Sequence, residues 1–284
     1  MFSAAHRGTL LPVTENNKVS TEDPQKKFLV AGHKGIYLFP NLVTTGVLFA
    51  GFYGIVAAID GNFPRSAVAL FIAMVLDGLD GRLARLTGTQ SEFGKEFDSL
   101  SDLVAFGVAP AIIVYQWGLH RLAEYGWLWG KLGWLAAFLY AASAALRLAR
   151  FNVMPETDDK RFLEGLPSPS AAALVTFTVW LGTVLGWSGG GALAFAAAMT
   201  VLGGALMVSH LHFYSFKEAS PDRRISFTFL LAIPLTLVLI FLNPPVVLFM
   251  MATGYAISGP IVTFCIRRQR STNHQGGEEG ESRT

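Results

Sequence analysis

The sequence has little charge and almost no cysteine. Charged residues make up 15% of the 284 residues, against about 25% in an ordinary soluble domain, and hydrophobic residues make up 52%. This composition excludes a disordered chain. The formal net charge of only +2 excludes the strongly basic surface of a nucleic-acid-binding protein, so no nucleic-acid partner is expected. The single cysteine, Cys265, excludes a disulfide scaffold because it has no second cysteine to pair with.

The apolar residues are gathered in blocks of about 20, the length that crosses a membrane as a helix. Turn residues such as Asp60-Gly61-Asn62 and Asn243-Pro244-Pro245 separate the blocks. The sequence therefore predicts an all-α fold, a polytopic membrane helix bundle with about eight transmembrane helices. The expected segments are Ile36–Ile59, Ser66–Leu86, Phe97–Trp117, Leu132–Phe151, Ser170–Trp187, Gly191–Phe213, Ile225–Leu242 and Pro245–Ile266.

Both ends of the chain are polar. Residues 1–34 are expected to form a cytoplasmic tail, residues 35–266 the membrane domain, and residues 267–284 a disordered cytoplasmic tail. With the N-terminus in the cytoplasm, every lysine and arginine except Arg65, Arg121 and Lys131 falls on the cytoplasmic side. This asymmetry follows the positive-inside rule. It predicts an integral protein of the cell (inner) membrane with both termini in the cytoplasm.

Four aspartates lie where the second and third apolar segments meet. The apolar run Ser66–Leu76 is too short to cross a hydrocarbon core of about 30 Å, so its helix must continue through Asp77 and Asp80. These two share a helix face at i, i+3, and Asp98 and Asp102 share a face at i, i+4. Two antiparallel helices would thus bring four carboxylates together just beneath the inner membrane surface. Ionisable groups at such depth usually mark a functional site.

The cluster offers only oxygen ligands, which favours a hard divalent cation: Mg²⁺ or Mn²⁺, with Ca²⁺ as an alternative. The pattern Thr89-Gln90-Ser91-Glu92 is typical of a capping box and predicts the start of the second acidic helix. Two other interpretations stay open. The acids could form an ion-pair network with nearby arginines, or belong to a divalent-cation transporter. Against the transporter, no polar residues continue a path outward through Val104–Trp117.

The acids belong to a longer pattern, which reads Asp77-x2-Asp80-Gly81-x2-Ala84-Arg85-x8-Gly94-x3-Asp98-x3-Asp102. At every position it resembles the motif of the CDP-alcohol phosphotransferase family. The resemblance implies a membrane enzyme that moves a phosphatidyl-type group from a CDP-linked lipid to an alcohol and releases CMP. It also implies a divalent-metal site, a bundle of at least six spans, a surrounding of membrane lipid and, usually, a homodimer.

The resemblance also implies roles for individual residues. Asp77, Asp80 and Asp98 would hold metal, and Asp102 would contact metal and act as the general base. Asn41 and Thr44 lie in a short element at the start of the first span, for which a helix start capped by Asn41 is the alternative interpretation. The residues expected to bind the CDP part of the lipid are Asn41, Thr44, Gly81, Ala84, Arg85, Ser91 and Gly94.

Three stretches resemble the phosphatidylserine synthase branch of the family: FDSLSDLVAFGVAP at 97–110, RLARFN at 147–152 and GLPSP at 165–169. They imply CDP-diacylglycerol and L-serine as substrates. We hypothesise that Arg147, Arg150 or both bind the serine carboxylate, and anchoring at the inner membrane surface is the alternative. The competing interpretations are a related enzyme that uses glycerol 3-phosphate or inositol phosphate as the acceptor, or one that uses an ether-lipid donor.

Overall fold

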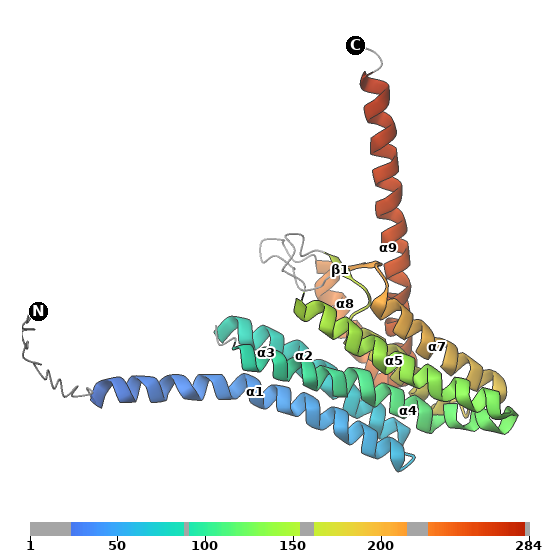
Figure 1. The fold of residues 1–284 in the computed structure, drawn as a ribbon, viewed down its shortest axis with the longest axis horizontal. Helices are drawn as coiled ribbons and strands as arrows, with labels where there is room; N and C mark the ends of the chain where they lie inside the picture. The colour runs from blue at the N-terminus through green and yellow to red at the C-terminus, as the bar shows by residue number, and fades with distance from the viewer. Residues whose placement is uncertain (1–23, 88–90, 154–161, 215–226, 282–284) are drawn as a thin grey trace, which may run out of the picture.

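The computed structural model is almost entirely helical and describes residues 24–87, 91–153, 162–214 and 227–281 (Figure 1). A π-helical turn, η1, and a 3₁₀-helix, η2, interrupt the α-helices, and two short strands are present. The elements in chain order are α1 (Pro24–Ile59), α2 (Phe63–Thr87), α3 (Glu92–Asp102), η1 (Leu103–Val108), α4 (Ala109–Trp117), η2 (Leu119–Tyr125), α5 (Trp127–Val153), β1 (Phe162–Glu164), α6 (Ser168–Val184), α7 (Gly190–Val208), β2 (His212–Tyr214), α8 (Phe227–Leu242) and α9 (Pro244–Glu281).

The predicted all-α membrane bundle is confirmed. Each of the eight predicted segments contains a helix, or the continuous run from α3 through η1 to α4, but the one predicted at Gly191–Phe213 is helical only to Val208 and its end enters β2. Within the described residues, five helices are long and apolar enough to cross a membrane, and the apolar helix Ser168–Val184 is slightly shorter. The number of spans and the side on which the termini lie stay predictions. The five helical segments are Asn41–Ile59, Glu92–Tyr125, Trp127–Val153, Gly190–Val208 and Pro244–Phe264.

The secondary structure at both ends differs from the expectation. Helix α1 already begins at Pro24, inside the segment 1–34 expected as a polar tail, and α9 continues to Glu281, through most of the stretch expected to be disordered. Polar sequence without an apolar face gives no periodic signal, but a nucleated helix extends at little cost per residue. Proline also suits the first helical position, because the N–H group that it lacks has no intrahelical partner there.

Helix α6 forms the centre of the bundle. Every residue from Ala171 to Val179 is buried, and the helix packs against α2, α4, α7 and α9. A helix that is apolar on all sides belongs in an interior, and its small residues let neighbouring helices approach closely. The first residue of α6, Ser168, is therefore buried as well, with 1% of its surface exposed.

Helix α1 packs against α2 and against the helical run that begins with α3. The backbones of α1 and of this run approach closely at Gly51, where an added Cβ would lie 2.6 Å from the Cα of Ala105. Only glycine leaves room for this contact. It holds α1, with Asn41 and Thr44 near its middle, beside the two helices that carry the aspartates.

A small antiparallel sheet joins β1 to β2 at one end of the bundle, with Glu164 opposite His212 (Figure 1). The turn after β1 is fixed by Gly165, which has φ +78° and whose N–H donates to the Leu211 carbonyl at 2.8 Å. A Cβ on Gly165 would lie 2.4 Å from the Met207 carbonyl oxygen. The sheet therefore packs tightly against the end of α7 and leads directly into α6.

The span predicted at Phe97–Trp117 contains the π-helical turn η1 immediately after Asp102. Pro110 has no N–H to donate to the carbonyl of Phe106, its partner in a regular α-helix. The fully buried Tyr140 of α5 donates its hydroxyl to that carbonyl at 2.9 Å instead. Such π-turns are frequent at functional sites. This one links the backbone that follows Asp102 to α5.

Candidate active site

Three of the four predicted aspartates converge. A carboxylate oxygen from each of Asp77, Asp98 and Asp102 lies within 4.8 Å of the other two, and the three side chains are half-buried. Asp77 comes from α2 and the other two come from α3, as the helical spacing predicted. Carboxylates this close repel one another unless positive charge compensates them. An all-oxygen donor set suits a hard divalent cation, so these residues fit the metal that the sequence predicts.

The fourth aspartate, Asp80, is buried and accepts a hydrogen bond from the hydroxyl of Thr44 on α1. It is outside the group of three among the residues that the structure describes. Asp80 lies three residues after Asp77, about 4.5 Å further along the helix axis, and its carboxylate is bound by Thr44 of α1. Thr44, predicted to contact the nucleotide, thus contacts an acid of the motif, and the metal role of Asp80 stays a prediction.

Three residues predicted to bind the nucleotide lie together where α1 meets α3. Ser91 is the N-cap of α3, and its Oγ accepts from the Gly94 N–H at 3.0 Å. A Cβ on Gly94 would lie 3.0 Å from that Oγ and 3.5 Å from Oδ1 of Asn41. The predicted capping box is wrong in register, because Ser91 rather than Thr89 caps the helix. Both Ser and Thr are common N-cap residues, and Ser is the better of the two, which agrees with Ser91 as the cap.

The remaining motif residues lie at the end of α2. Gly81 is exposed at the surface of the helix, one residue after Asp80. The backbone of Ala84 and Arg85 belongs to α2, but their side chains lie outside the described part of the structure. Their predicted contacts with the CDP group stay predictions.

Arg147 lies beside the acidic cluster with 9% of its surface exposed. Its Nη1 donates to the Oγ of Ser168 at 3.1 Å, and the guanidinium lies 4.5 Å from the centre of the Phe151 ring. The positive charge interacts electrostatically with Asp102 and Asp77. Its buried Nε has no hydrogen-bond partner within the described residues. A buried N–H without an acceptor costs about 1–3 kcal/mol, so this group is suited to an incoming anion.

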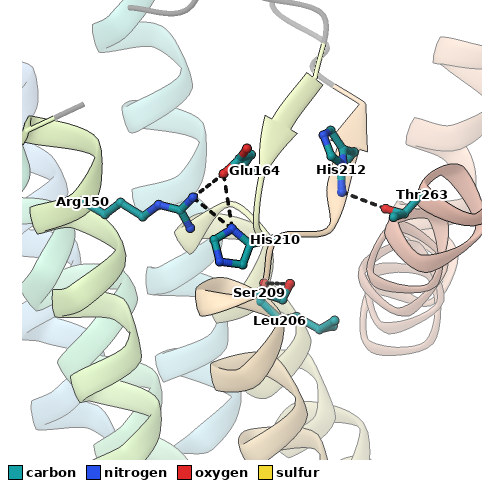
Figure 2. A network of polar contacts seen from close by, with 7 residues as sticks. All are labelled: Arg150, Glu164, Leu206, Ser209, His210, His212 and Thr263. Atoms are coloured by element: carbon teal, nitrogen blue, oxygen red, sulfur yellow. Dashed lines mark hydrogen bonds and ion pairs between the residues drawn. The ribbon is translucent and has the colours of Figure 1, made fainter. Parts of the chain in front are cut away.

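Arg150, one turn further along α5, has different surroundings. Its Nη2 forms an ion pair with Glu164 of β1 and lies 3.3 Å from Nδ1 of His210 (Figure 2). That Nδ1 is also 3.6 Å from the Glu164 carboxylate. The structure therefore separates the two arginines: Arg150 is held by an internal anion, whereas Arg147 faces the acidic cluster. Glu164 and His210 lie far apart in the sequence, and they come together where β1 pairs with β2.

The three stretches that suggested the serine branch are joined by hydrogen bonds. Asn152 of RLARFN donates to the Ser99 hydroxyl at 3.1 Å, which ties the end of α5 to α3 beside Asp98. The GLPSP turn carries Ser168, the hydrogen-bond partner of Arg147. Sequence reasoning missed Tyr140 of α5, which donates its hydroxyl to the Phe106 carbonyl in the helical run that follows Asp102. A single tyrosine in an apolar run gives no periodic or motif signal.

Known proteins resemble this chain, two of the following three along most of its length. The CDP-diacylglycerol–serine O-phosphatidyltransferase of Helicobacter pylori (strain ATCC 700392 / 26695) is 37% identical over 226 residues, which are 80% of this chain and 91% of that protein. The protein of the same name from Mycobacterium tuberculosis (strain ATCC 25618 / H37Rv) is 30% identical over 250 residues, 84% of this chain and 82% of its own. The archaetidylserine synthase of Methanothermobacter thermautotrophicus is 34% identical over 139 residues, 48% of this chain and 55% of its own.

Residues 37–208 match the family described as CDP-alcohol phosphatidyltransferase. The matched region contains all four aspartates of the motif and both arginines, and it ends before β2, α8 and α9. It covers more than half of the chain. The protein is therefore a member of the CDP-alcohol phosphatidyltransferase family.

Proposed function

We propose that this chain transfers the phosphatidyl group of CDP-diacylglycerol to the hydroxyl of L-serine, giving phosphatidylserine and CMP. The observation that carries the proposal is the group of three carboxylates beside the buried Arg147. Family membership supports phosphatidyl transfer, and the names of the similar proteins support serine as the acceptor.

The oxygens of Asp77, Asp98 and Asp102 are the proposed ligands of Mg²⁺ or Mn²⁺, with Asp80 as a further ligand positioned by Thr44. A divalent cation bound there neutralises the clustered carboxylates and polarises the phosphoryl oxygens of the donor. The chain itself positions the reactants at the depth of the lipid headgroups. The acyl chains of the donor can then stay in the bilayer.

In the proposed reaction, the serine hydroxyl oxygen forms a bond to the phosphorus that carries the lipid. The bond from that phosphorus to the oxygen shared with CMP breaks, and CMP leaves. Asp102 accepts the proton of the attacking hydroxyl. General-base assistance of this kind contributes about 10²- to 10⁴-fold to a rate.

The CDP group is proposed to lie across the contact of α1, α2 and α3. Ser91 and Gly94 lie beside Asn41 at this contact, which supports one continuous binding surface. The exposed Gly81 leaves the α2 backbone accessible nearby. Ala84 and Arg85 follow Gly81 by three and four residues, so the helical repeat places them on the same face of α2. Arg85 is proposed to bind the phosphates.

For the acceptor, we assign the serine carboxylate to Arg147. Its Nε can donate without breaking the bond from Nη1 to Ser168, and a charged donor and acceptor make a strong hydrogen bond. The position beside Asp102 supports this assignment, because the serine hydroxyl must reach the general base.

Arg150 is expected to have a structural role. Arg150→Ala should change the KM for serine by less than about threefold and lower the apparent unfolding temperature, because the ion pair with Glu164 is only partly exposed. Arg121→Ala is the matched control, since it removes the more exposed pair with Glu124. A serine KM raised more than tenfold by Arg150→Ala would reassign the carboxylate to Arg150.

We also propose that the chain works as a homodimer in the cell (inner) membrane, with both termini and the active site on the cytoplasmic side. The distribution of lysine and arginine supports this orientation. The membrane domain is proposed to span residues 35–266, with tails on either side.

The reaction can be tested with the purified protein, a CDP-lipid and Mg²⁺ or Mn²⁺, by measuring CMP. We expect release that depends on L-serine and is abolished by a chelator. Glycerol 3-phosphate and inositol phosphate serve as competing acceptors, and an ester-linked donor is compared with an ether-linked one, since one similar protein is an archaetidylserine synthase. Release with glycerol 3-phosphate alone, or metal flux without CMP, would contradict the proposal.

A further inference from the structure

Ser168, the first residue of α6, is buried beside Arg147 and has 1% of its surface exposed. Its Oγ accepts from Nη1 of Arg147 at 3.1 Å, although the two residues are 21 positions apart in the chain. Resting on the proposed function, we propose that Ser168 is a positioning residue for the acceptor. It holds one edge of the Arg147 guanidinium, so that the other edge, formed by Nε and Nη2, binds the carboxylate of the amino acid.

The two edges of this guanidinium have different surroundings. Nη1 is on the Cδ side of the group, whereas the Nε–H and Nη2 lie together on the other edge, which can bind both oxygens of a carboxylate through two parallel hydrogen bonds. Nη1 of Arg147 is bound to Ser168, and the buried Nε has no hydrogen-bond partner within the described residues. The centre of the Phe151 ring lies 4.5 Å from Cζ and restricts the group further. The bond to the serine therefore leaves the bidentate edge for a ligand.

Two contacts join α5 to the helical run from α3 to η1, and they fix the level at which Arg147 lies. One is at Ala144, whose Cβ would lie 3.0 Å from a Cβ on Gly107. The other is the hydrogen bond from Asn152 to the Ser99 hydroxyl, at 3.1 Å. Arg147 lies between these contacts on α5, and the proposed general base lies between them on the other run. The arginine is therefore level with the group that must accept the proton of the serine hydroxyl.

The chain around Ser168 is held firmly in place. The N–H groups of Gly165 and Leu166 donate to carbonyls near the end of α7, at 2.8 and 2.9 Å, and both residues are buried. Pro167 and Pro169 flank Ser168, and the ring of each proline fixes its backbone φ. The hydroxyl is thus anchored independently of Arg147, which is what a group that orients the guanidinium requires.

The test is Ser168→Ala, which removes the hydroxyl. Thr178→Val is the matched control, since Thr178 is buried in the same helix and donates to the Leu174 carbonyl of that helix. We expect Ser168→Ala to raise the KM for L-serine about five- to tenfold, because the bidentate edge is no longer aligned. The kcat and the KM for the CDP-lipid should change less than twofold, and Thr178→Val should change none of these values more than twofold.

Two analogues of serine distinguish alignment of the arginine from a general disturbance of the site. L-alanine keeps the carboxylate but has no hydroxyl, and its inhibition constant should rise about five- to tenfold in Ser168→Ala. Ethanolamine has no carboxylate, and its inhibition constant should not change. When Arg147 is already replaced by alanine, adding Ser168→Ala should raise the KM for serine less than twofold further, because the hydroxyl acts through the arginine. If Ser168→Ala does not fold, Ser168→Cys, whose sulfur is only a weak acceptor, is measured in the same way.

An unchanged KM for serine in the folded variant would overturn the inference. Equal changes for L-alanine, ethanolamine and the CDP-lipid would also overturn it, because they indicate a merely structural role, and so would additive effects of the two substitutions. Failure of the proposed function gives a different result, since the wild type would then release CMP only with another alcohol. In that case the KM of Ser168→Ala for that alcohol is measured, and a value equal to that of the wild type overturns the inference.

Discussion

Asp102→Asn is expected to reduce serine-dependent CMP release by about 10³-fold or more. The substitution removes the proposed general base, a loss of about 10²- to 10⁴-fold by itself. It also removes one of three carboxylates whose oxygens lie within 4.8 Å of one another, so metal affinity should fall as well. The side chain keeps its size, and the π-turn that follows is anchored independently by Tyr140. The loss should therefore come from chemistry rather than from unfolding.

Thermal unfolding with and without Mn²⁺ gives a measurement that does not depend on activity. A ligand that binds only the folded state stabilises it in proportion to the logarithm of its concentration over Kd, so Mn²⁺ should raise the unfolding temperature of the wild type. In chelator, Asp102→Asn should be at least as stable as the wild type, because it relieves repulsion between carboxylates. Mn²⁺ should raise the unfolding temperature of Asp102→Asn by less than it raises that of the wild type.

Asp60→Asn is the control for Asp102→Asn, since Asp60 is exposed in the turn between α1 and α2. It should leave both CMP release and the response to Mn²⁺ unchanged. Wild-type CMP release by Asp102→Asn would rule out Asp102 as the base. If Mn²⁺ raised the unfolding temperature of Asp102→Asn as much as that of the wild type, Asp102 would not be a metal ligand.

The convergence of the acids was predictable because it depends on local rules. Helical spacing puts Asp98 and Asp102 on one face, and the need to cross the membrane puts α2 antiparallel to the helix that carries them. The partner of Asp80 was not predictable, since it depends on how α1 is rotated and how closely it approaches through Gly51. That rotation is set by packing across the whole bundle, and no local pattern records it.

The helical breaks and the strands also depend on partners that come from distant parts of the chain. Pro110 signals that Phe106 loses a backbone donor, but the compensating hydroxyl of Tyr140 comes from another helix. Strands of three residues carry no usable alternation, so β1 and β2 could not be recognised in the sequence. They form because the chain segments before α6 and after α7 meet and satisfy their backbone groups there.

The two arginines of RLARFN show what three-dimensional structure adds to a motif. By spacing alone Arg147 and Arg150 are equivalent, one turn apart at the end of the same helix. The structure gives Arg150 an internal anion from β1 and leaves Arg147 buried beside the acids. Sequence could not separate them, because Glu164 reaches Arg150 only through the pairing of β1 with β2.

Arg147→Ala is accordingly expected to raise the KM for L-serine about 10- to 100-fold, the effect of losing hydrogen bonds to a charged group. The KM for the CDP-lipid should change much less. Arg147→Lys should have an intermediate effect, because lysine keeps the charge but lacks the planar set of donors that includes Nε. Steady-state kinetics with each substrate varied in turn separates these outcomes.

Arg147→Ala should also change how much Mn²⁺ raises the unfolding temperature, and the change should be opposite to that expected for Asp102→Asn. Removing positive charge from beside Asp77 and Asp102 leaves their repulsion less compensated, so Arg147→Ala should be less stable than the wild type in chelator. Mn²⁺ should then restore more stability to this variant than it adds to the wild type. Arg121→Ala should show neither change. A raised KM for the CDP-lipid with an unchanged KM for serine would place Arg147 at the donor phosphates instead of the acceptor.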